Sequence, residues 1–151
     1  MTKLLKILII DDDKIDSITI IRSISRSDIN AEIESAYSAK EGFEKLESAC
    51  FDLIFLDYMM PDSDGISILK KIRNLKIDTP VIFITSQGDE NIASQAILAG
   101  ASDYMPKTLL TTDGISHSVR NAMKLFESQK LRKKTELALK INSKRLSEAQ
   151  K

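Results

Sequence analysis

Polar residues stand at the ends of separate apolar runs, and this placement constrains the fold more than any other feature of the sequence. Each of them ends or directly follows a run that is typical of a strand; they are Asp11 and Asp12, Asp57, Thr85 and Lys107. In a parallel sheet the carboxyl ends of the strands meet at one edge, where α/β proteins bind their ligands. If the runs are parallel strands, these side chains therefore lie together.

The body of the chain alternates strand-like and helix-like patterns. Apolar runs predict strands at residues 6–10, 32–36, 52–56, 81–85 and 101–105. Between the strands, apolar residues recur at helical spacing, as at Ile66, Leu69 and Ile72. Five such units in succession favour a doubly wound, five-stranded parallel sheet with helices on both faces.

Local signals place several of the helices more closely. Four isoleucines recur at every third position after the first strand and predict a helix: Ile15, Ile18, Ile21 and Ile24. Ser38 and Glu41 have the spacing of a capping box, which begins a helix. Gly100 follows an apolar helical pattern and is typical of a residue that ends one.

Charge and composition divide the chain into a body, residues 1–126, and a tail, residues 127–151. The chain carries no net charge, but the tail has eight basic residues against three acidic ones, so the body is acidic. All five glycines and all three prolines lie between Gly42 and Gly114. The tail lacks both residue types and is rich in good helix formers, so we expect one continuous helix there.

Composition also limits the class of protein. At 151 residues and 42% hydrophobic, the chain can bury one ordinary core. Cys50 is the only cysteine, which excludes an internal disulfide framework and a Cys-rich zinc site and fits a reducing compartment. The first residues lack the pattern of a signal peptide, and no apolar stretch is long enough to span a bilayer. We expect a cytoplasmic chain with no membrane segment.

The polar residues at the strand ends have a chemistry in common. Three carboxylates attract a divalent cation, and oxygen ligands suit Mg²⁺. A hydroxyl and an ammonium beside them suit the oxygens of a phosphoryl group. Each residue alone has a simpler interpretation, since an acidic run such as residues 11–13 is often only a helix cap. The combination favours a site for a cation and a phosphoryl group.

Four segments carry a family resemblance, in order and at suitable spacing. They are residues 7–13, 56–65, 80–85 and 100–107, with the sequences ILIIDDD, LDYMMPDSDG, PVIFIT and GASDYMPK. Together they resemble the receiver domain of two-component response regulators, over residues 4–126. The resemblance implies a flavodoxin-like sheet of strand order 2-1-3-4-5. It also implies a phosphorylation switch that catalyses its own phosphorylation and dephosphorylation.

By this resemblance Asp57 is the nucleophile. It would take a phosphoryl group from a phosphohistidine of a histidine kinase or a phosphotransfer protein. Mg²⁺ would offset the repulsion between the carboxylate and the phosphoryl group. The family pattern implies that its ligands are Asp12, Asp57 and the backbone carbonyl of Met59, with Asp11 binding through water.

The resemblance also implies which residues read the phosphoryl group. Lys107 would place its charge on a phosphoryl oxygen, and Thr85 would donate its hydroxyl. Tyr104 matches the aromatic switch residue that moves inward or outward with the Thr85 hydroxyl. Thr108 departs from the pattern, because a proline that forms a cis peptide is common there. A cis bond before a non-proline residue costs about 3 kcal/mol. The sequence therefore leaves open whether the bond between Lys107 and Thr108 is cis or trans.

Two other functions compete with a phosphorylation switch. A haloacid-dehalogenase-type phosphatase also uses an aspartate and Mg²⁺, but it needs a second aspartate where this chain has Met59. A pseudo-receiver is a docking module with the same fold, and it typically lacks one or more of the acids, the threonine or the lysine. Since this chain has all of them, both alternatives are disfavoured.

The tail indicates how the domain is used, but it leaves two interpretations open. A four-three repeat is formed by Thr135, Leu139, Asn142, Leu146 and Ala149, of which only two are strongly apolar. The tail is then either a coiled coil that makes a homodimer or a solvated linker to another domain. It has no turn of the kind a helix-turn-helix requires, so no specific nucleic-acid partner is expected.

Overall fold

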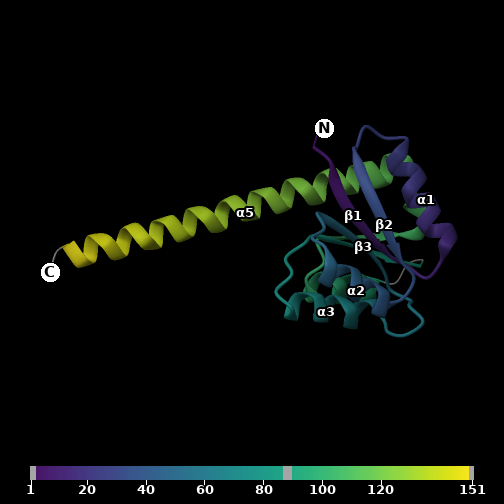
Figure 1. The fold of residues 1–151 in the computed structure, drawn as a ribbon, viewed down its shortest axis with the longest axis horizontal. Helices are drawn as coiled ribbons and strands as arrows, with labels where there is room; N and C mark the ends of the chain where they lie inside the picture. The colour runs from purple at the N-terminus through teal and green to yellow at the C-terminus, as the bar shows by residue number, and fades with distance from the viewer. Residues whose placement is uncertain (1–2, 87–89, 150–151) are drawn as a thin grey trace.

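A doubly wound α/β sheet forms the body of the molecule. The computed structural model describes residues 3–86 and 90–149, in which five parallel strands form one sheet of order β2-β1-β3-β4-β5 (Figure 1). The strands are β1 (Leu5–Ile10), β2 (Ala31–Ala36), β3 (Leu53–Asp57), β4 (Val81–Thr85) and β5 (Asp103–Pro106). This confirms the predicted flavodoxin-like sheet. Strand order reverses between β1 and β3, so their carboxyl ends flank the switch point.

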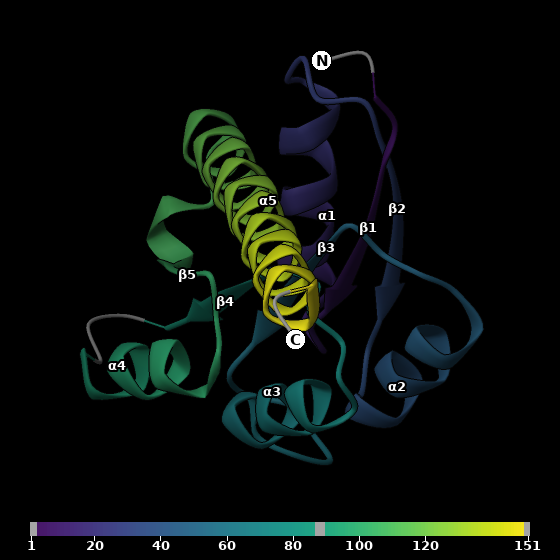
Figure 2. The same ribbon diagram turned by 90° about the vertical axis from the view of Figure 1, so that its left-hand side faces the viewer.

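Helices cover both faces of this sheet (Figure 2). They are α1 (Lys14–Ser25), α2 (Ala39–Ser48), α3 (Gly65–Asn74), α4 (Glu90–Ala99) and α5 (Thr112–Ala149), with a 3₁₀ turn, η1 (Lys107–Leu109), after β5. Helices α1 and α5 pack together on one face. Helices α2, α3 and α4 cover the other face.

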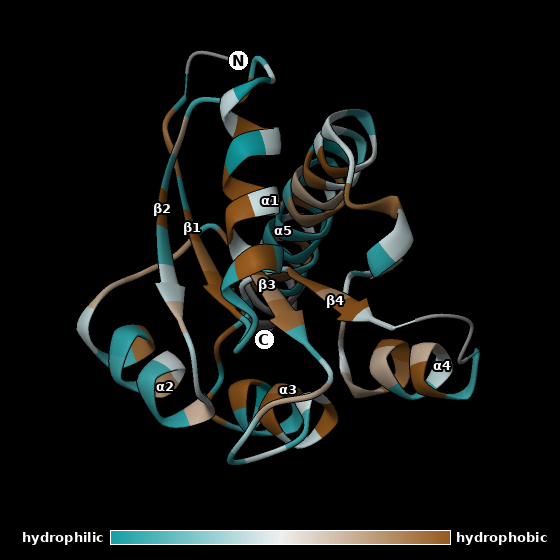
Figure 3. Cartoon of the chain, turned by 90° about the vertical axis from the view of Figure 1, so that its right-hand side faces the viewer, coloured by the Kyte–Doolittle hydropathy of each residue, from teal (hydrophilic) through white to brown (hydrophobic). Residues whose placement is uncertain are grey.

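Successive side chains of the central strands point to opposite faces of the sheet and form two hydrophobic cores. Leu53 and Phe55 of β3 point into the core under α1 and α5, while Ile54 and Leu56 point into the core under α2 and α3. All four are fully buried, and the hydrophobic colour of β3 and β4 in Figure 3 reflects burial on both faces. Burial of each such side chain contributes about 1.5–3 kcal/mol. The strands are therefore fixed firmly enough to hold charged residues at their ends.

Most predicted helix signals are confirmed by their hydrogen bonds. Ser38 caps α2 by accepting from the backbone N–H of Glu41 at 3.1 Å. Gly100 ends α4 with a positive φ of 111°, and the next backbone N–H, that of Ala101, reaches back to Ala96 at 2.9 Å. The isoleucine pattern predicted α1 correctly, but Ile15 and Ile18 are exposed.

Helix α5 is much longer than the body that it packs on. Its first part contributes Ile115, Val119 and Met123 to the core. Beyond this part the helix leaves the sheet and continues as a straight extension (Figure 1). Every described side chain in residues 127–142 is exposed. The predicted continuous helix is confirmed. Among the described residues, no helix is both long and apolar enough to cross a membrane.

Candidate functional site

Three carboxylates meet at the carboxyl ends of β1 and β3. Asp57 is the last residue of β3, and Asp11 and Asp12 directly follow β1. One carboxylate oxygen from each of them lies within 4.8 Å of one from each of the other two. Asp11 and Asp57 are buried, whereas Asp12 is exposed at the mouth of the site. Adjacent strands at the switch point thus bring together the acids that the sequence placed at separate strand ends.

Without a bound cation, burial of these carboxylates is electrostatically costly. Desolvation, reinforced by the charge of Asp57, raises the pKa of Asp11 to about 7, although the backbone N–H of Asp13 donates to Asp11 Oδ1 at 2.8 Å. Asp11 Oδ2 is buried and accepts no hydrogen bond from any residue that the structure describes. Desolvation raises the pKa of Asp57 as well, against the opposing charge of Lys107. A hard divalent cation would satisfy these oxygens, and the residues present fit Mg²⁺.

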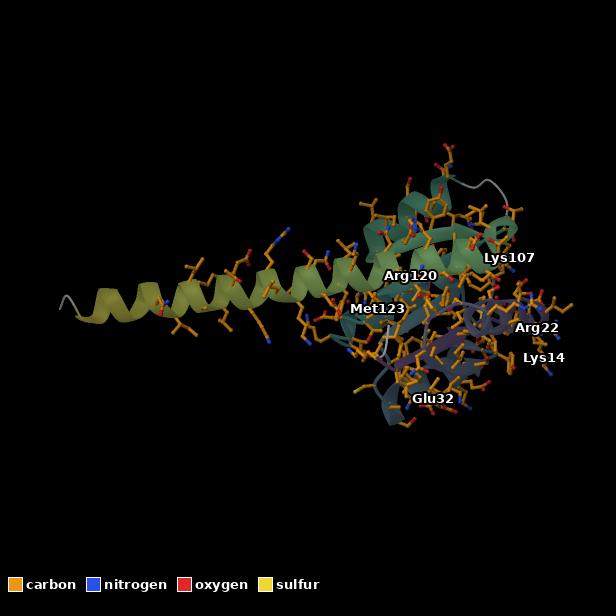
Figure 4. The ribbon with its side chains drawn as sticks, turned by 90° about the horizontal axis from the view of Figure 1, so that it is seen from above. Lys14, Arg22, Glu32, Lys107, Arg120 and Met123 are labelled. Atoms are coloured by element: carbon orange, nitrogen blue, oxygen red, sulfur yellow. The ribbon has the colours of Figure 1, made fainter. Side chains whose placement is uncertain are left out.

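Lys107 brings the positive charge of the site. It follows β5 and begins the turn η1, and Figure 4 shows it at the end of the body away from the α5 extension. Its Nζ lies 3.6 Å from Asp57 Oδ1 and 2.8 Å from Oδ2 of a fourth acid, Asp16. Burial alone would lower the pKa of Lys107, but Asp16, Asp57 and Asp11 together raise it. The lysine is therefore held as an ammonium.

Asp16 was missed in the sequence. It lies in the first turn of α1, four residues after Asp12, where an acidic residue is usual near the positive end of a helix. The four-residue spacing from Asp12 was a signal in the sequence, because it indicates that Asp16 faces back toward the end of β1. Its contact with Lys107 joins residues 91 positions apart, and helix spacing alone does not predict such a contact.

Thr85 lies on β4, beside β3, and Tyr104 lies on β5, the next strand of the sheet, with different surroundings. Thr85 ends β4 and is buried, and its neighbour Ile84 pairs with Asp57 across the sheet. Tyr104 on β5 is exposed and borders a shallow hollow formed with Ile97 and Leu98 of α4. Thr85 is thus at the site edge, whereas Tyr104 faces outward from the sheet.

The loop after β3 is shaped by a close backbone approach. Gly65 begins α3, and its N–H donates to the carbonyl of Tyr58 at 2.7 Å. A Cβ at this position would stand 2.5 Å from the carbonyl oxygen of Asp57, so only glycine fits. Met59 forms a β-bridge with Asp64 in this loop, and its side chain is exposed.

The loop after β5 has ordinary peptide geometry. Among the described residues no peptide bond is cis, so the bond between Lys107 and Thr108 is trans. The Lys107 ammonium still reaches Asp57 from the turn η1. A cis peptide is therefore not needed to bring this lysine to the site.

The geometry of the sheet, the acids and the lysine agrees with comparisons to known proteins. A family model described as the response regulator receiver domain matches residues 7–120. The chain belongs to the response regulator receiver family. It is a phosphorelay receiver, and the alternative of a pseudo-receiver that only docks a partner is not supported.

Individual relatives of this receiver come from several kinds of protein. The transcriptional regulatory protein ResD of Bacillus subtilis is 38% identical over 105 residues, which are 68% of this chain and 41% of ResD. The hybrid signal transduction histidine kinase G of Dictyostelium discoideum is 31% identical over 115 residues, which are 74% of this chain and 3% of the kinase. The chain thus spans less than half the length of these relatives.

Solved structures agree on the fold. A two-component response regulator from Clostridium difficile is 31% identical, with a TM-score of 0.71, and the match covers 80% of this chain and 96% of that one. Receiver domains interact with histidine kinases or phosphotransfer proteins and generally bind Mg²⁺ at an acidic pocket. In this chain the corresponding pocket contains Asp11, Asp12 and Asp57.

Proposed function

We propose that Asp57 accepts a phosphoryl group from the phosphohistidine of a histidine kinase or phosphotransfer protein, in a Mg²⁺-dependent reaction. One observation carries this proposal. Asp57 is buried at the switch point of the sheet, within a three-carboxylate cluster and 3.6 Å from an ammonium. Its carboxylate oxygen would attack phosphorus while the bond from phosphorus to the histidine nitrogen breaks, which leaves neutral histidine and an aspartyl phosphate.

Asp11, Asp12, Asp57 and the backbone carbonyl of Met59 would hold Mg²⁺. The bound cation supplies positive charge that reduces the repulsion between the carboxylate and the incoming phosphoryl group. Asp11 suits an indirect role through water, because its Oδ1 already accepts from the backbone of Asp13 while its buried Oδ2 is free to accept. The hydrogen bond of Asp11 supports this division of roles.

Lys107 and Thr85 would bind the phosphoryl group and so favour one conformation. The phosphoryl group carries roughly two negative charges in place of the single charge of the Asp57 carboxylate, and it brings three acceptor oxygens to the end of β3. An ammonium and a hydroxyl from neighbouring strands stabilise that charge only when it is present, which gives the differential interaction that a switch needs. Tyr104, exposed on β5, is the residue whose position would follow Thr85.

The extension of α5 would carry the output, and a second copy of this chain is the partner we infer for it. Large apolar side chains are exposed along it, at Leu131, Leu137, Leu139 and Ile141. Leu139 belongs to the predicted four-three repeat, whereas the side chains of Leu146 and Ala149 lie outside the described part. Pairing of two extensions along this repeat would bury Leu139 together with Thr135 and Asn142. A division at residue 126, a cytoplasmic location and the lack of a specific nucleic-acid partner stay predictions.

Intact-mass spectrometry after incubation with acetyl phosphate tests the phosphoryl acceptor. The expected result is a single phosphoryl adduct that needs Mg²⁺ and is missing in Asp57→Asn. Asp52→Asn is a matched control, because Asp52 lies at the opposite end of β3 and accepts from the backbone of Lys6. An adduct of equal yield on Asp57→Asn would contradict the proposal, and so would the lack of an adduct on the unmodified protein while Mg²⁺ binds.

A further inference from the structure

The ammonium of Lys107 lies closer to Asp16 than to the acceptor Asp57. The distances from Nζ are 2.8 Å to Asp16 Oδ2 and 3.6 Å to Asp57 Oδ1. In the described part of the chain, the carboxylates close enough together to share one cation are those of Asp11, Asp12 and Asp57. Asp16 stands outside this group, so its contact in the site is with the lysine.

Both partners of this ion pair are held by secondary structure. Asp13 caps α1 and accepts from the backbone N–H groups of Ile15 and Asp16, which fixes the turn that carries Asp16. Lys107 is anchored by β5 on one side and η1 on the other. The two side chains are only 18% and 28% exposed, so water screens their attraction less than it screens a surface ion pair.

The position of this pair matters because of what the lysine would otherwise contact. Of the carboxylates that the structure describes, Asp57 is the other one within ion-pair distance of the ammonium. An ammonium paired directly with Asp57 would block its carboxylate oxygens. These oxygens are needed to attack phosphorus and to bind the cation. The lysine stem is long and flexible, so its ammonium can move between neighbouring oxygens without moving the backbone.

We propose that Asp16 is a positioning residue that draws Lys107 away from Asp57 before phosphorylation and releases it to the phosphoryl group afterwards. This inference rests on the proposed function of Asp57 as acceptor. With the lysine on Asp16, the Asp57 carboxylate is open to Mg²⁺ and to the phosphoryl donor. The phosphoryl oxygens then compete with Asp16 for the ammonium, so phosphorylation breaks a contact between α1 and the β5 end of the sheet.

The test is a double-mutant cycle on Mg²⁺ affinity, measured by isothermal titration calorimetry on the full chain without a phosphoryl donor. The proteins are the unmodified chain, Asp16→Asn, Lys107→Met and the double variant. Asp16→Asn removes one charge in both backgrounds, but only with Lys107 present does it also move an ammonium onto Asp57. We expect it to weaken Mg²⁺ binding about fivefold more with Lys107 than with Met at position 107, a coupling typical of residues in contact.

Two controls separate positioning from general effects. Glu47→Gln removes one carboxylate from the exposed surface of α2 and should leave Mg²⁺ affinity nearly unchanged. Asp16→Glu keeps the charge and should recover most of the affinity that Asp16→Asn loses. The ¹⁵N chemical shift of the Lys107 side chain should change in Asp16→Asn and stay near the original value in Glu47→Gln.

The outcomes distinguish this inference from the function on which it rests. An equal effect of Asp16→Asn in both backgrounds would mean that Asp16 acts only through its charge, and would overturn the positioning role. Acetyl phosphate labelling of Asp57 would remain intact in that case. If the unmodified protein bound no Mg²⁺, the metal dependence of the proposed function would fail first, and this inference with it.

Discussion

The carboxyl edge of the sheet and the extension of α5 both carry many charges, in opposite surroundings. At the sheet edge, Asp11 and Asp57 are buried and Lys107 is held between two carboxylates. Along residues 127–142 every described side chain is exposed to solvent. A buried charge destabilises the folded protein unless it is paired, whereas a solvated surface charge changes the stability little. Charged side chains therefore form a buried cluster in one region and a solvated surface in the other.

The largest difference between the regions should come from one leucine-to-alanine change made in both. Leu53→Ala removes a fully buried side chain from β3 and should lower the free energy of unfolding by about 2–5 kcal/mol. Leu137→Ala makes the same change on the extension, where the residue is 60% exposed, and should change it by less than about 0.5 kcal/mol. Urea unfolding followed by circular dichroism measures both. Equal losses would mean that the extension packs against the body.

The buried acids should make the stability of the body depend on pH. The pKa of Asp11 is about 7 in the folded protein and about 4 in the unfolded chain, so between these values only the folded state binds the proton. Stability without Mg²⁺ should therefore fall as pH rises from about 4 to 7, by up to about 4 kcal/mol, and then level off. Thermal unfolding between pH 5 and 8 measures this slope.

The origin of that slope can be isolated in two ways. Asp11→Asn removes the titrating group, so its stability should fall less between pH 5 and 7 than that of the unmodified protein. Saturating Mg²⁺ should raise the melting temperature at pH 8 more than at pH 5, because the cation binds the ionised acids. A slope that survives in Asp11→Asn would place its origin in other groups.

Serine-to-alanine changes in the two regions should have opposite effects on helix stability. Ser38→Ala removes the N-cap of α2 and should destabilise the protein by about 1 kcal/mol. Ser128→Ala lies on the exposed part of α5, where alanine is the better helix former, and should increase helicity slightly. Circular dichroism at 222 nm during thermal unfolding follows both variants. Destabilisation by Ser128→Ala would show that its hydroxyl makes a contact.

Deletion of residues 127–151 should have the smallest effect on the body. The deleted part contributes exposed side chains throughout residues 127–142, so the unfolding free energy of residues 1–126 should be nearly unchanged. Acetyl phosphate labelling should be unchanged as well, whereas any dimer seen by sedimentation should be lost. A large loss of stability would move the domain boundary into the extension.

Sequence patterns predicted the fold well because its three central strands, β1, β3 and β4, are buried on both faces. Residues 81–85 read as a strand from end to end, and β4 has those limits. The positions of Asp57 and Thr85 at strand ends then placed them at one edge of the sheet. The long helix followed from a tail without glycine or proline, since nothing there interrupts a helix.

These sequence patterns did not predict contacts between elements that are distant in the chain. Asp62, in the loop after β3, accepts from the backbone N–H groups of Ala39 and Lys40 at the start of α2, which also lowers its pKa. Arg73 spans from α3 to the carbonyl of Gly100 at the end of α4. Asp16 reaches Lys107 in the same way. Each depends on how helices are set against the sheet, which local spacing does not determine.

The most direct test of Asp57 as the phosphoryl acceptor is borohydride trapping of the labelled protein. Borohydride reduces an aspartyl phosphate to homoserine, and peptide mapping by mass spectrometry then identifies the position that carried the group. After incubation with acetyl phosphate and Mg²⁺, homoserine should appear at position 57 and disappear when Mg²⁺ is withheld. Homoserine at position 11, 12 or 16 instead of 57 would contradict the account.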